Sequence, residues 1–215
     1  MRVRHALGRV RRSVALDTFD VFVRPVGDAD ATYETPPGYR LAWAAPEDVA
    51  RCDEHHTQLS AEDRRLGIER LKLGHQCVIA FHGELAVFSM WMNPRNIHVP
   101  GQFKRRLRAD QAFIYKAFTS PEHRGRGLYE AGMHFVLAHL RSVGKRELLG
   151  YAHVTKTVSR KGLAALRFQS LGTFLTFTTP IWRQTFVSGK LRANLPLAPA
   201  DPRRLEVDPS IATPR

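Results

Sequence analysis

Apolar residues recur at spacings that predict helices and strands through the central part of the chain. Residues 39–45 (YRLAWAA) predict a strand, and residues 46–56 predict a helix that has Pro46 in its first turn. Residues 60–74 predict a second helix, which opens with a Ser-x-x-Asp variant of the capping box and ends at a glycine. Residues 76–92 then predict two strands joined by a tight turn, so a hairpin follows two helical segments.

The second half of this region predicts a buried strand, a long helix and more β structure. A polar, basic connection leads to residues 112–119 (AFIYKAFT), where apolar and aromatic residues on both faces indicate a buried strand. The helix that follows has one apolar face and ends at Gly144. Residues 147–155 predict a strand, residues 159–172 a helix, and residues 173–187 a β-rich end. The apolar helix face consists of Leu128, Ala131, Phe135, Val136, Leu140 and Val143.

The two ends of the chain differ from this central region. We therefore expect a basic extension over residues 1–38, one domain over residues 39–190 and a proline-rich tail over residues 191–215. Between the arginines of the extension, apolar residues at helical spacing predict a basic amphipathic helix, which would contact an anionic membrane surface or pack on the domain. The tail is rich in proline and charge, so most of it is expected to be disordered. The helix residues are Val3, Leu7, Val10 and Val14.

The composition indicates a globular protein that attracts anions. The chain has 215 residues, of which 43% are hydrophobic and 25% are charged, enough for one domain with its own core. The net charge of +13 favours phosphates, nucleic acid or an anionic membrane as partners, and does not choose among them. Cys52 and Cys77 make no disulfide framework, and no apolar run is long enough for a membrane-spanning helix. We therefore expect a cytoplasmic protein.

Residues 120–135 (SPEHRGRGLYEAGMHF) join the buried strand to the long helix. The first turn of a helix has unpaired N–H groups, and the helix dipole attracts anions to it. Gly125 and Gly127 would let the backbone approach a bulky anion, and Arg124 and Arg126 would add positive charge. A solvated basic turn is the alternative interpretation. No P-loop motif is present, and the third glycine of a dinucleotide-binding motif is missing.

The segment Pro121-Glu122-His123-Arg124-Gly125-Arg126-Gly127-Leu128 resembles the acyl-CoA loop of the GNAT acyltransferase superfamily. The family motif, Arg/Gln-x-x-Gly-x-Gly/Ala, lies between the fourth strand and the third helix. Arg124 and Gly127 match its first and fourth positions, whereas Tyr129 replaces its last small residue. The predicted order of elements over residues 39–190 also agrees with the family. The resemblance implies an α+β fold: a mixed, mostly antiparallel twisted sheet flanked by helices, with strands 4 and 5 splayed around the acyl-CoA.

The resemblance further implies acetyl-CoA or another acyl-CoA as co-substrate, and no metal. The backbone of two strand residues would pair with the pantetheine arm, and the N–H groups of the loop would hold the pyrophosphate. Cys52, His55 and His56 form a loose cluster without a second ligand pair, which fits a helix surface better than a metal site. The expected cofactor-binding residues are Phe118, Thr119, Arg124, Gly125, Arg126, Gly127, Leu128 and Tyr129.

Two positions where the family often carries its catalytic groups hold phenylalanine here. Phe113 stands in place of the glutamate base, and Phe168 stands in place of the tyrosine that protonates the thiolate. Tyr115 lies two residues after Phe113, hence on the same strand face, and Tyr151 and His153 share a face of the next strand. We expect these three residues to substitute, since tyrosine and histidine can transfer protons. For each tyrosine, the alternative is a core aromatic with a satisfied hydroxyl.

The resemblance favours an N-acyltransferase, and specifically an N-acetyltransferase, that moves an acyl group from acyl-CoA to an amine by direct attack. One alternative uses a longer chain from acyl carrier protein, as N-acyl amino acid synthases do, and basic residues would suit that acidic partner. Another is a non-catalytic protein that binds a ligand or nucleic acid, although no aromatic platform or recognition motif is visible for the latter. The expected partner is a small-molecule or peptide amine, which no motif in the sequence identifies.

Overall fold

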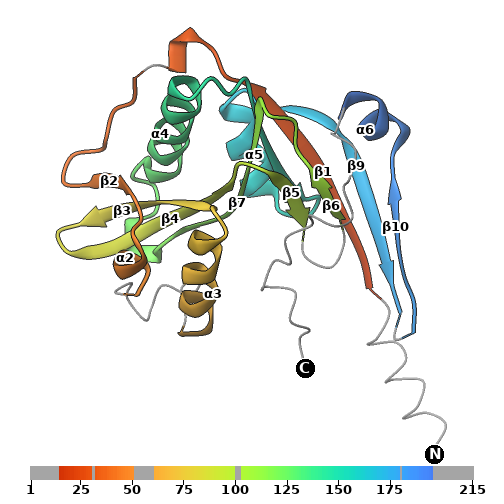
Figure 1. The fold of residues 1–215 in the computed structure, drawn as a ribbon, viewed down its shortest axis with the longest axis horizontal. Coiled ribbons are helices and arrows are strands. Elements are labelled where there is room, and N and C mark those ends of the chain that lie inside the picture. The colour runs from red at the N-terminus through yellow and green to blue at the C-terminus, as the bar shows by residue number, and fades with distance from the viewer. Residues whose placement is uncertain (1–14, 31, 51–60, 100–102, 180, 196–215) are drawn as a thin grey trace, which may run out of the picture. The chain divides into compact units, whose positions relative to one another are not determined.

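The computed structural model describes residues 15–30, 32–50, 61–99, 103–179 and 181–195 (Figure 1). The amphipathic helix predicted before residue 15 and the tail beyond residue 195 lie outside the described residues. The elements, in chain order, are β1 (Ala15–Pro25), η1 (Asp28–Asp30), β2 (Arg40–Trp43), α2 (Pro46–Ala50), α3 (Ala61–Lys72), β3 (Gln76–His82), β4 (Leu85–Asn93), β5 (Asn96–Val99), β6 (Phe103–Arg106), β7 (Gln111–Thr119), η2 (Pro121–His123), α4 (Leu128–Ser142), β8 (Glu147–His153), α5 (Thr157–Ala165), β9 (Gln169–Thr178), β10 (Arg183–Val187) and α6 (Gly189–Asn194).

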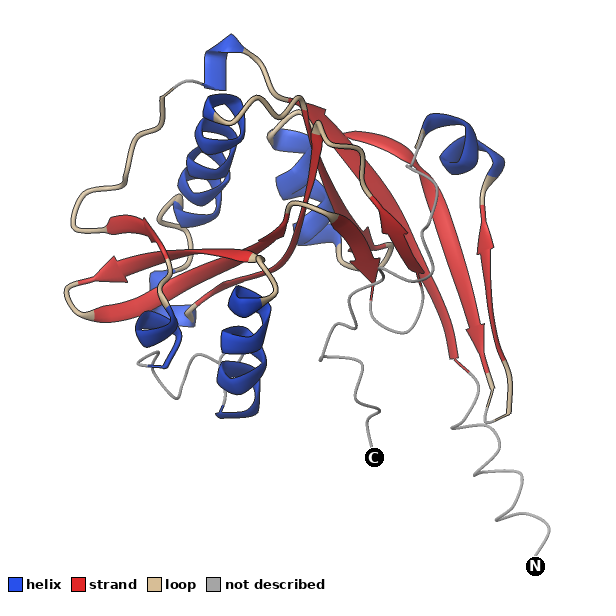
Figure 2. Cartoon of the chain, viewed as in Figure 1, coloured by secondary structure: helices blue, strands red, loops and turns tan. Residues whose placement is uncertain are grey.

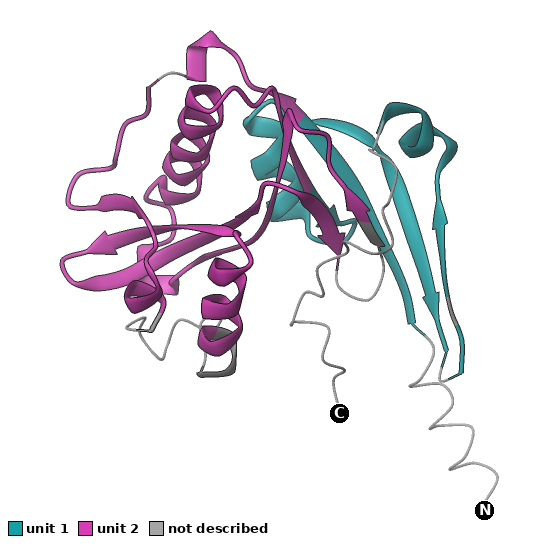
Figure 3. Ribbon diagram, in the orientation of Figure 1, with its two compact units in different colours: residues 1–23, 151–196 teal, residues 24–150, 197–215 magenta. Residues whose placement is uncertain are grey.

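Contacts within the chain group it into two compact units, which Figure 3 shows in different colours. Unit 1 contains the described residues of Met1–Val23 and Tyr151–Pro196, and unit 2 contains those of Arg24–Gly150. The division therefore falls inside strands β1 and β8. Among the described residues, no helix is long and apolar enough to cross a membrane.

Unit 2 contains a sheet in which β2, β3, β4 and β7 pair antiparallel, while β7 pairs in parallel with the start of β8. Nearly every residue of β3 and β4 is buried, because α4 covers one face of the sheet and α2 and α3 cover the other (Figure 2). The helices approach closely at glycines. A Cβ on Gly132 of α4 would lie 2.5 Å from the Phe88 ring, and one on Gly67 of α3 would lie 3.2 Å from the Trp91 ring. Mixed strands flanked by helices confirm the predicted α+β class.

Two parts of unit 2 show how far local patterns predicted the strands. The β3–β4 hairpin is confirmed, with Gly83 in the left-handed region at φ +59°. The basic connection after β4 was predicted as a loop, but β5 and β6 pair within it. All four residues of β5 are buried, including Ile97 and Val99. The flanking arginines and prolines conceal this short apolar alternation in the sequence.

Unit 1 contains the antiparallel strands β1, β9 and β10, with β9 paired to both of the others. Strand β1 comes from the segment predicted as an N-terminal extension, and its Phe19 stacks on Phe174 of β9 with ring centroids 5.2 Å apart. Helix α6 begins where Ser188 Oγ accepts a hydrogen bond from the Leu191 backbone N–H at 3.2 Å. The Thr173 N–H of β9 also donates to Ser188 Oγ at 3.1 Å, so β1 and α6 both depend on partners distant in sequence. As domain boundaries, residues 38 and 191 stay a prediction.

Candidate active site

The glycine-rich loop between β7 and α4 has the backbone geometry that a close approach requires. Gly125 and Gly127 have φ values of +73° and +74°, in the left-handed region that side chains disfavour. Gly127 is also the residue before α4, and its carbonyl accepts the Ala131 N–H at 2.9 Å. No side chain caps this helix start. The N–H groups of the first turn therefore face the loop, where Arg126 is exposed.

The side chains around this helix start make different contacts. Arg124 Nε donates to the Thr119 carbonyl at 3.2 Å, which ties the loop back to the end of β7. Tyr129, at the position where the family motif has a small residue, is half-buried, and burial raises the pKa of its hydroxyl to about 12. The tyrosine therefore stays neutral at physiological pH. Glu130 is exposed and lies 3.9 Å from His134 one turn later.

Strand β7 changes its register just before this loop. Its pairing with β4 shifts between Ser89 and Trp91, opposite the segment that contains Lys116, whose φ is +48°. Such bulges re-aim backbone and side chains and are common beside active sites. Phe118 and Thr119 still pair with β4 beyond the shift. Strands β7 and β8 pair over residues 111–113 and 147–149. The splaying of these strands stays a prediction.

Tyr115 lies immediately before the bulge and is part of a hydrogen-bonded group on one face of the sheet. Its hydroxyl is hydrogen-bonded to His75 Nδ1. His75 is buried, and its Nε2 lies 3.0 Å from the side-chain nitrogen of Asn93, which is also buried. The Tyr115 ring stacks on Phe113 with centroids 5.7 Å apart and lies 6.5 Å from Trp91. These contacts join the Tyr115 hydroxyl, His75 and Asn93 into one chain of polar groups.

The direction of this chain follows from Asn93. Its Oδ1 accepts the backbone N–H groups of Arg95 at 2.9 Å and Asn96 at 3.0 Å, so its Nδ2 must be the donor to His75. His75 Nε2 is then an acceptor, and the neutral imidazole carries its hydrogen on Nδ1. That N–H donates to the Tyr115 oxygen. The hydroxyl of Tyr115 therefore directs its own hydrogen to a group other than His75.

The other two predicted catalytic residues belong to unit 1. His153 Nδ1 is 2.7 Å from Thr155 Oγ1, and its Nε2 is 3.7 Å from Asp17. Tyr151 packs against Phe19 at a centroid distance of 5.6 Å, and burial raises the pKa of its hydroxyl. These contacts favour a packing role for Tyr151. Tyr115 belongs to unit 2, so the structure does not bring the three predicted residues into one described group.

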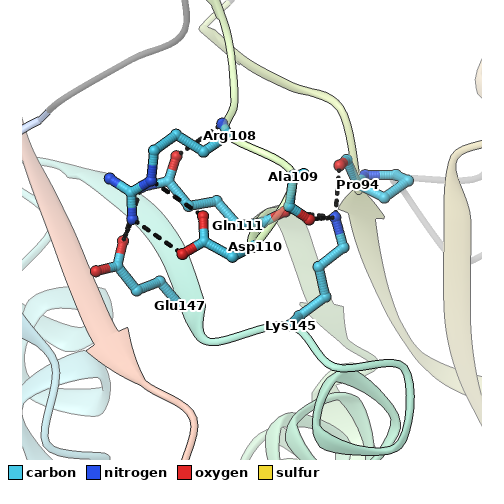
Figure 4. Close-up of polar contacts among 7 residues, drawn as sticks. All are labelled: Pro94, Arg108, Ala109, Asp110, Gln111, Lys145 and Glu147. Atoms are coloured by element: carbon cyan, nitrogen blue, oxygen red, sulfur yellow. Dashed lines mark hydrogen bonds and ion pairs between the residues drawn. The ribbon is translucent and has the colours of Figure 1, made fainter.

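At the start of β7 and β8, a cluster of charged and polar side chains joins the two strands (Figure 4). Arg108 donates to Asp110 at 3.0 Å and to Glu147 at 3.0 Å, and Gln111 donates to Glu147 at 2.7 Å. Lys145 Nζ donates to three backbone carbonyls at 2.8–3.2 Å. The hydrogen bond from Arg108 lowers the pKa of Asp110, and burial lowers the pKa of Lys145. We name Arg108, Asp110, Gln111, Lys145 and Glu147 the strand clamp.

Sequence reasoning missed His75 and Asn93. Strand pairing brings them to Tyr115, since Asn93 pairs with Phe113 and Trp91 pairs with Tyr115, and no local motif links these positions. Within the described parts of the chain, no group of three or more His, Cys, Asp or Glu side chains could hold a metal ion. Cys77 is buried, while Cys52, His55 and His56 lie outside the described residues.

No protein-family model matches the chain, and no curated protein matches it. Solved structures do match. An acetyltransferase assigned to the GNAT family from Novosphingobium aromaticivorans has a TM-score of 0.51 at 15% identity, over 76% of this chain and 64% of that one. A GCN5-related N-acetyltransferase from Sphaerobacter thermophilus has a TM-score of 0.54 at 12% identity, over 88% and 58%. A conserved protein of unknown function from Staphylococcus epidermidis has a TM-score of 0.52 at 10% identity, over 80% and 66%.

These similarities define the class of fold. The chain has the fold of the GNAT superfamily, as the loop motif and the order of elements predicted. It spans less than two thirds of the length of each of the three chains named above. At such low identity the likeness concerns the fold, so the reaction has to be argued from the residues of this chain.

Proposed function

We propose that this protein is an acyl-CoA-dependent N-acyltransferase. The observation that carries the proposal is the loop containing Gly125 and Gly127, which opens α4 directly after β7 in a chain with the GNAT fold. Its two left-handed glycines, uncapped helix start and exposed Arg126 together suit the pyrophosphate of an acyl-CoA. In this proposal the backbone of Phe118 and Thr119 contacts the pantetheine arm, although the Thr119 carbonyl also accepts from Arg124.

The chemistry requires an amine acceptor and a proton donor. The amine nitrogen attacks the thioester carbonyl, a C–N bond forms, the C–S bond breaks, and the leaving thiolate takes a proton. We assign that proton to the Tyr115 hydroxyl, because His75 donates to its oxygen and so directs the hydroxyl hydrogen away from the imidazole. The amine loses a proton in the same reaction, which returns Tyr115 to its neutral form. His153 is a weaker candidate because Thr155 and Asp17 hold its ring.

Calorimetry with acetyl-CoA tests the loop. Arg126→Glu should weaken binding at least about tenfold, because it places a negative charge beside the pyrophosphate. Arg106→Glu is the matched control, since Arg106 is also exposed and the change in net charge is the same. It should leave the dissociation constant within about twofold. Equal effects of the two variants would show that only net charge matters, and the loop assignment would fail.

Mass spectrometry of products tests the reaction and its donor. The protein is incubated with a panel of amines and either acetyl-CoA or long-chain acyl carrier protein. Acylation from acetyl-CoA supports the proposal. Acylation from the carrier protein alone would show that the acyl donor is acyl carrier protein and not acyl-CoA. Tyr115→Phe should lower kcat by about 100-fold without changing acetyl-CoA affinity. Binding of acetyl-CoA with no product from either donor would indicate a non-catalytic ligand-binding protein.

A further inference from the structure

Helix α3 places one arginine inside the protein. Arg70 is 1% exposed, and it lies three residues after Gly67, where an added Cβ would lie 3.2 Å from the Trp91 ring. Its guanidinium carbon lies 5.5 Å from the centroid of the Trp91 ring. Its backbone carbonyl accepts the N–H of His75 at 2.9 Å. Arg70 is thus attached to the same sheet face and the same turn that carry the His75–Tyr115 pair.

Within the described parts of the chain, the guanidinium of Arg70 has no hydrogen-bond partner. None of its three nitrogen atoms, Nε, Nη1 and Nη2, has one among the residues that the structure describes. The acidic residue beside it, Glu69, pairs instead with Arg65 at 3.2 Å on the exposed side of α3. A buried arginine remains charged, and burial without a partner is costly. The contact with Trp91 offsets only part of that cost. This pattern is expected where a ligand supplies the missing anion.

The geometry of the group defines the chemical class of the anion. A guanidinium presents a planar fork of donors that matches a carboxylate or a phosphate with two hydrogen bonds. One guanidinium balances the single charge of a carboxylate, whereas a phosphate dianion would leave a second buried charge uncompensated. His75, Tyr115 and Asn93 are neutral in the hydrogen-bond arrangement derived above, and add no positive charge. The site therefore favours a carboxylate.

We propose that Arg70 binds the carboxylate of the acceptor, so that the amine acylated by this protein belongs to an amino acid. This inference rests on the proposed acyl transfer. Trp91 contacts Arg70, and its ring centroid lies 6.5 Å from that of Tyr115. A carboxylate held by Arg70 therefore leaves the rest of a small acceptor on the sheet face that carries Tyr115. Because Arg70 is enclosed, binding requires the side chains around it to move apart.

The test compares acids with their amides on the purified full chain. The thermal midpoint is measured with each of the common L-amino acids and with the corresponding primary amides. We expect at least one acid to raise the midpoint while its amide does not, and to bind at least about 100-fold more tightly than the amide. Equal responses to acids and amides, or no response to any acid, would overturn the carboxylate site. This comparison needs no variant.

Two variants locate the effect. In Arg70→Met the response to the acid should disappear, whereas Arg65→Met, in the same helix but exposed, should respond like the wild type. An acid response that survives in Arg70→Met would assign the carboxylate to another residue. Acetyl-CoA binding is measured separately by calorimetry. Acid selectivity without acetyl-CoA binding would contradict the proposed acyl transfer, while acetyl-CoA binding without acid selectivity would contradict only the role of Arg70.

Discussion

Arg108 and Arg70 lie in the same unit, but their positive charges have opposite surroundings. Arg108 has Asp110 and Glu147 as ion-pair partners, and its side chain remains 31% exposed. Arg70 is 1% exposed and has no hydrogen-bond partner among the described residues. The strand clamp around Arg108 fixes the register of β7 against β8. Arg70 contributes no comparable link between elements.

The difference lies in what each charge contributes to the stability of the folded state. A charged group with all its hydrogen bonds made contributes to stability, or at least costs little. A buried charge without partners destabilises the folded state, and replacing it with an apolar side chain of similar volume is often neutral or stabilising. The two arginines should therefore respond to the same substitution with opposite signs.

The largest effect is expected from the lysine of the strand clamp. Lys145→Met removes three hydrogen bonds to the carbonyls of Pro94, Ala109 and Gln111 and should lower the free energy of unfolding by about 3 kcal/mol. Urea denaturation at pH 7 measures the change. Lys72→Met, at an exposed position at the end of α3, is the control and should change stability by less than about 0.5 kcal/mol. Similar losses of unfolding free energy in both variants would show that the hydrogen bonds of Lys145 do not stabilise the fold.

Arg70→Met is expected to stabilise the protein in the absence of ligands. Removing an unpaired buried charge should raise the free energy of unfolding by about 2 kcal/mol, even though the contact with Trp91 changes. The midpoint of urea denaturation should move to higher concentration. A lower midpoint would mean that Arg70 stabilises the folded state, and would contradict the claim that Arg70 and Arg108 affect stability with opposite signs.

Arg108→Met should change the free energy of unfolding in the opposite direction to Arg70→Met, and by a smaller amount. Its ion pairs with Asp110 and Glu147 are about one third exposed, so solvent screens them, and a loss of about 1 kcal/mol is expected. High salt should reduce the difference in free energy of unfolding between the variant and the wild type, because salt screens these ion pairs in the wild type. A variant more stable than the wild type would place Arg108 in the same category as Arg70.

The smallest effect concerns acid stability. Arg108 lowers the pKa of Asp110 from its ordinary 3.8, so the folded state holds this proton less tightly than the unfolded state does. The resulting stabilisation is present above the unfolded pKa and is lost as the pH falls through the folded one. Below about pH 4, stability should therefore fall less steeply in Asp110→Asn than in the wild type. Identical slopes in urea titrations at several pH values would contradict this.

Much of the fold could be predicted because its signals are local. The two helices before the hairpin, the hairpin itself and the loop–helix unit at Gly125, Gly127 and α4 each depend on residues that adjoin in sequence. Strands β1, β5 and β6 were missed, because β1 reads as part of a basic segment and only its pairing with β9 identifies it. Pairing between distant segments leaves little trace in a single sequence.

The candidate site divides in the same way. The sequence by itself determined the glycine loop, because left-handed backbone angles strongly favour glycine. It also identified Tyr115 by alternation along one strand, where its catalytic role stays a prediction. Only the tertiary structure showed that His75 and Asn93 orient Tyr115 and that Arg70 is buried without a hydrogen-bond partner among the described residues. Hydrogen-bond direction and burial depend on atoms from several elements. A spacing of residues along one segment does not encode them.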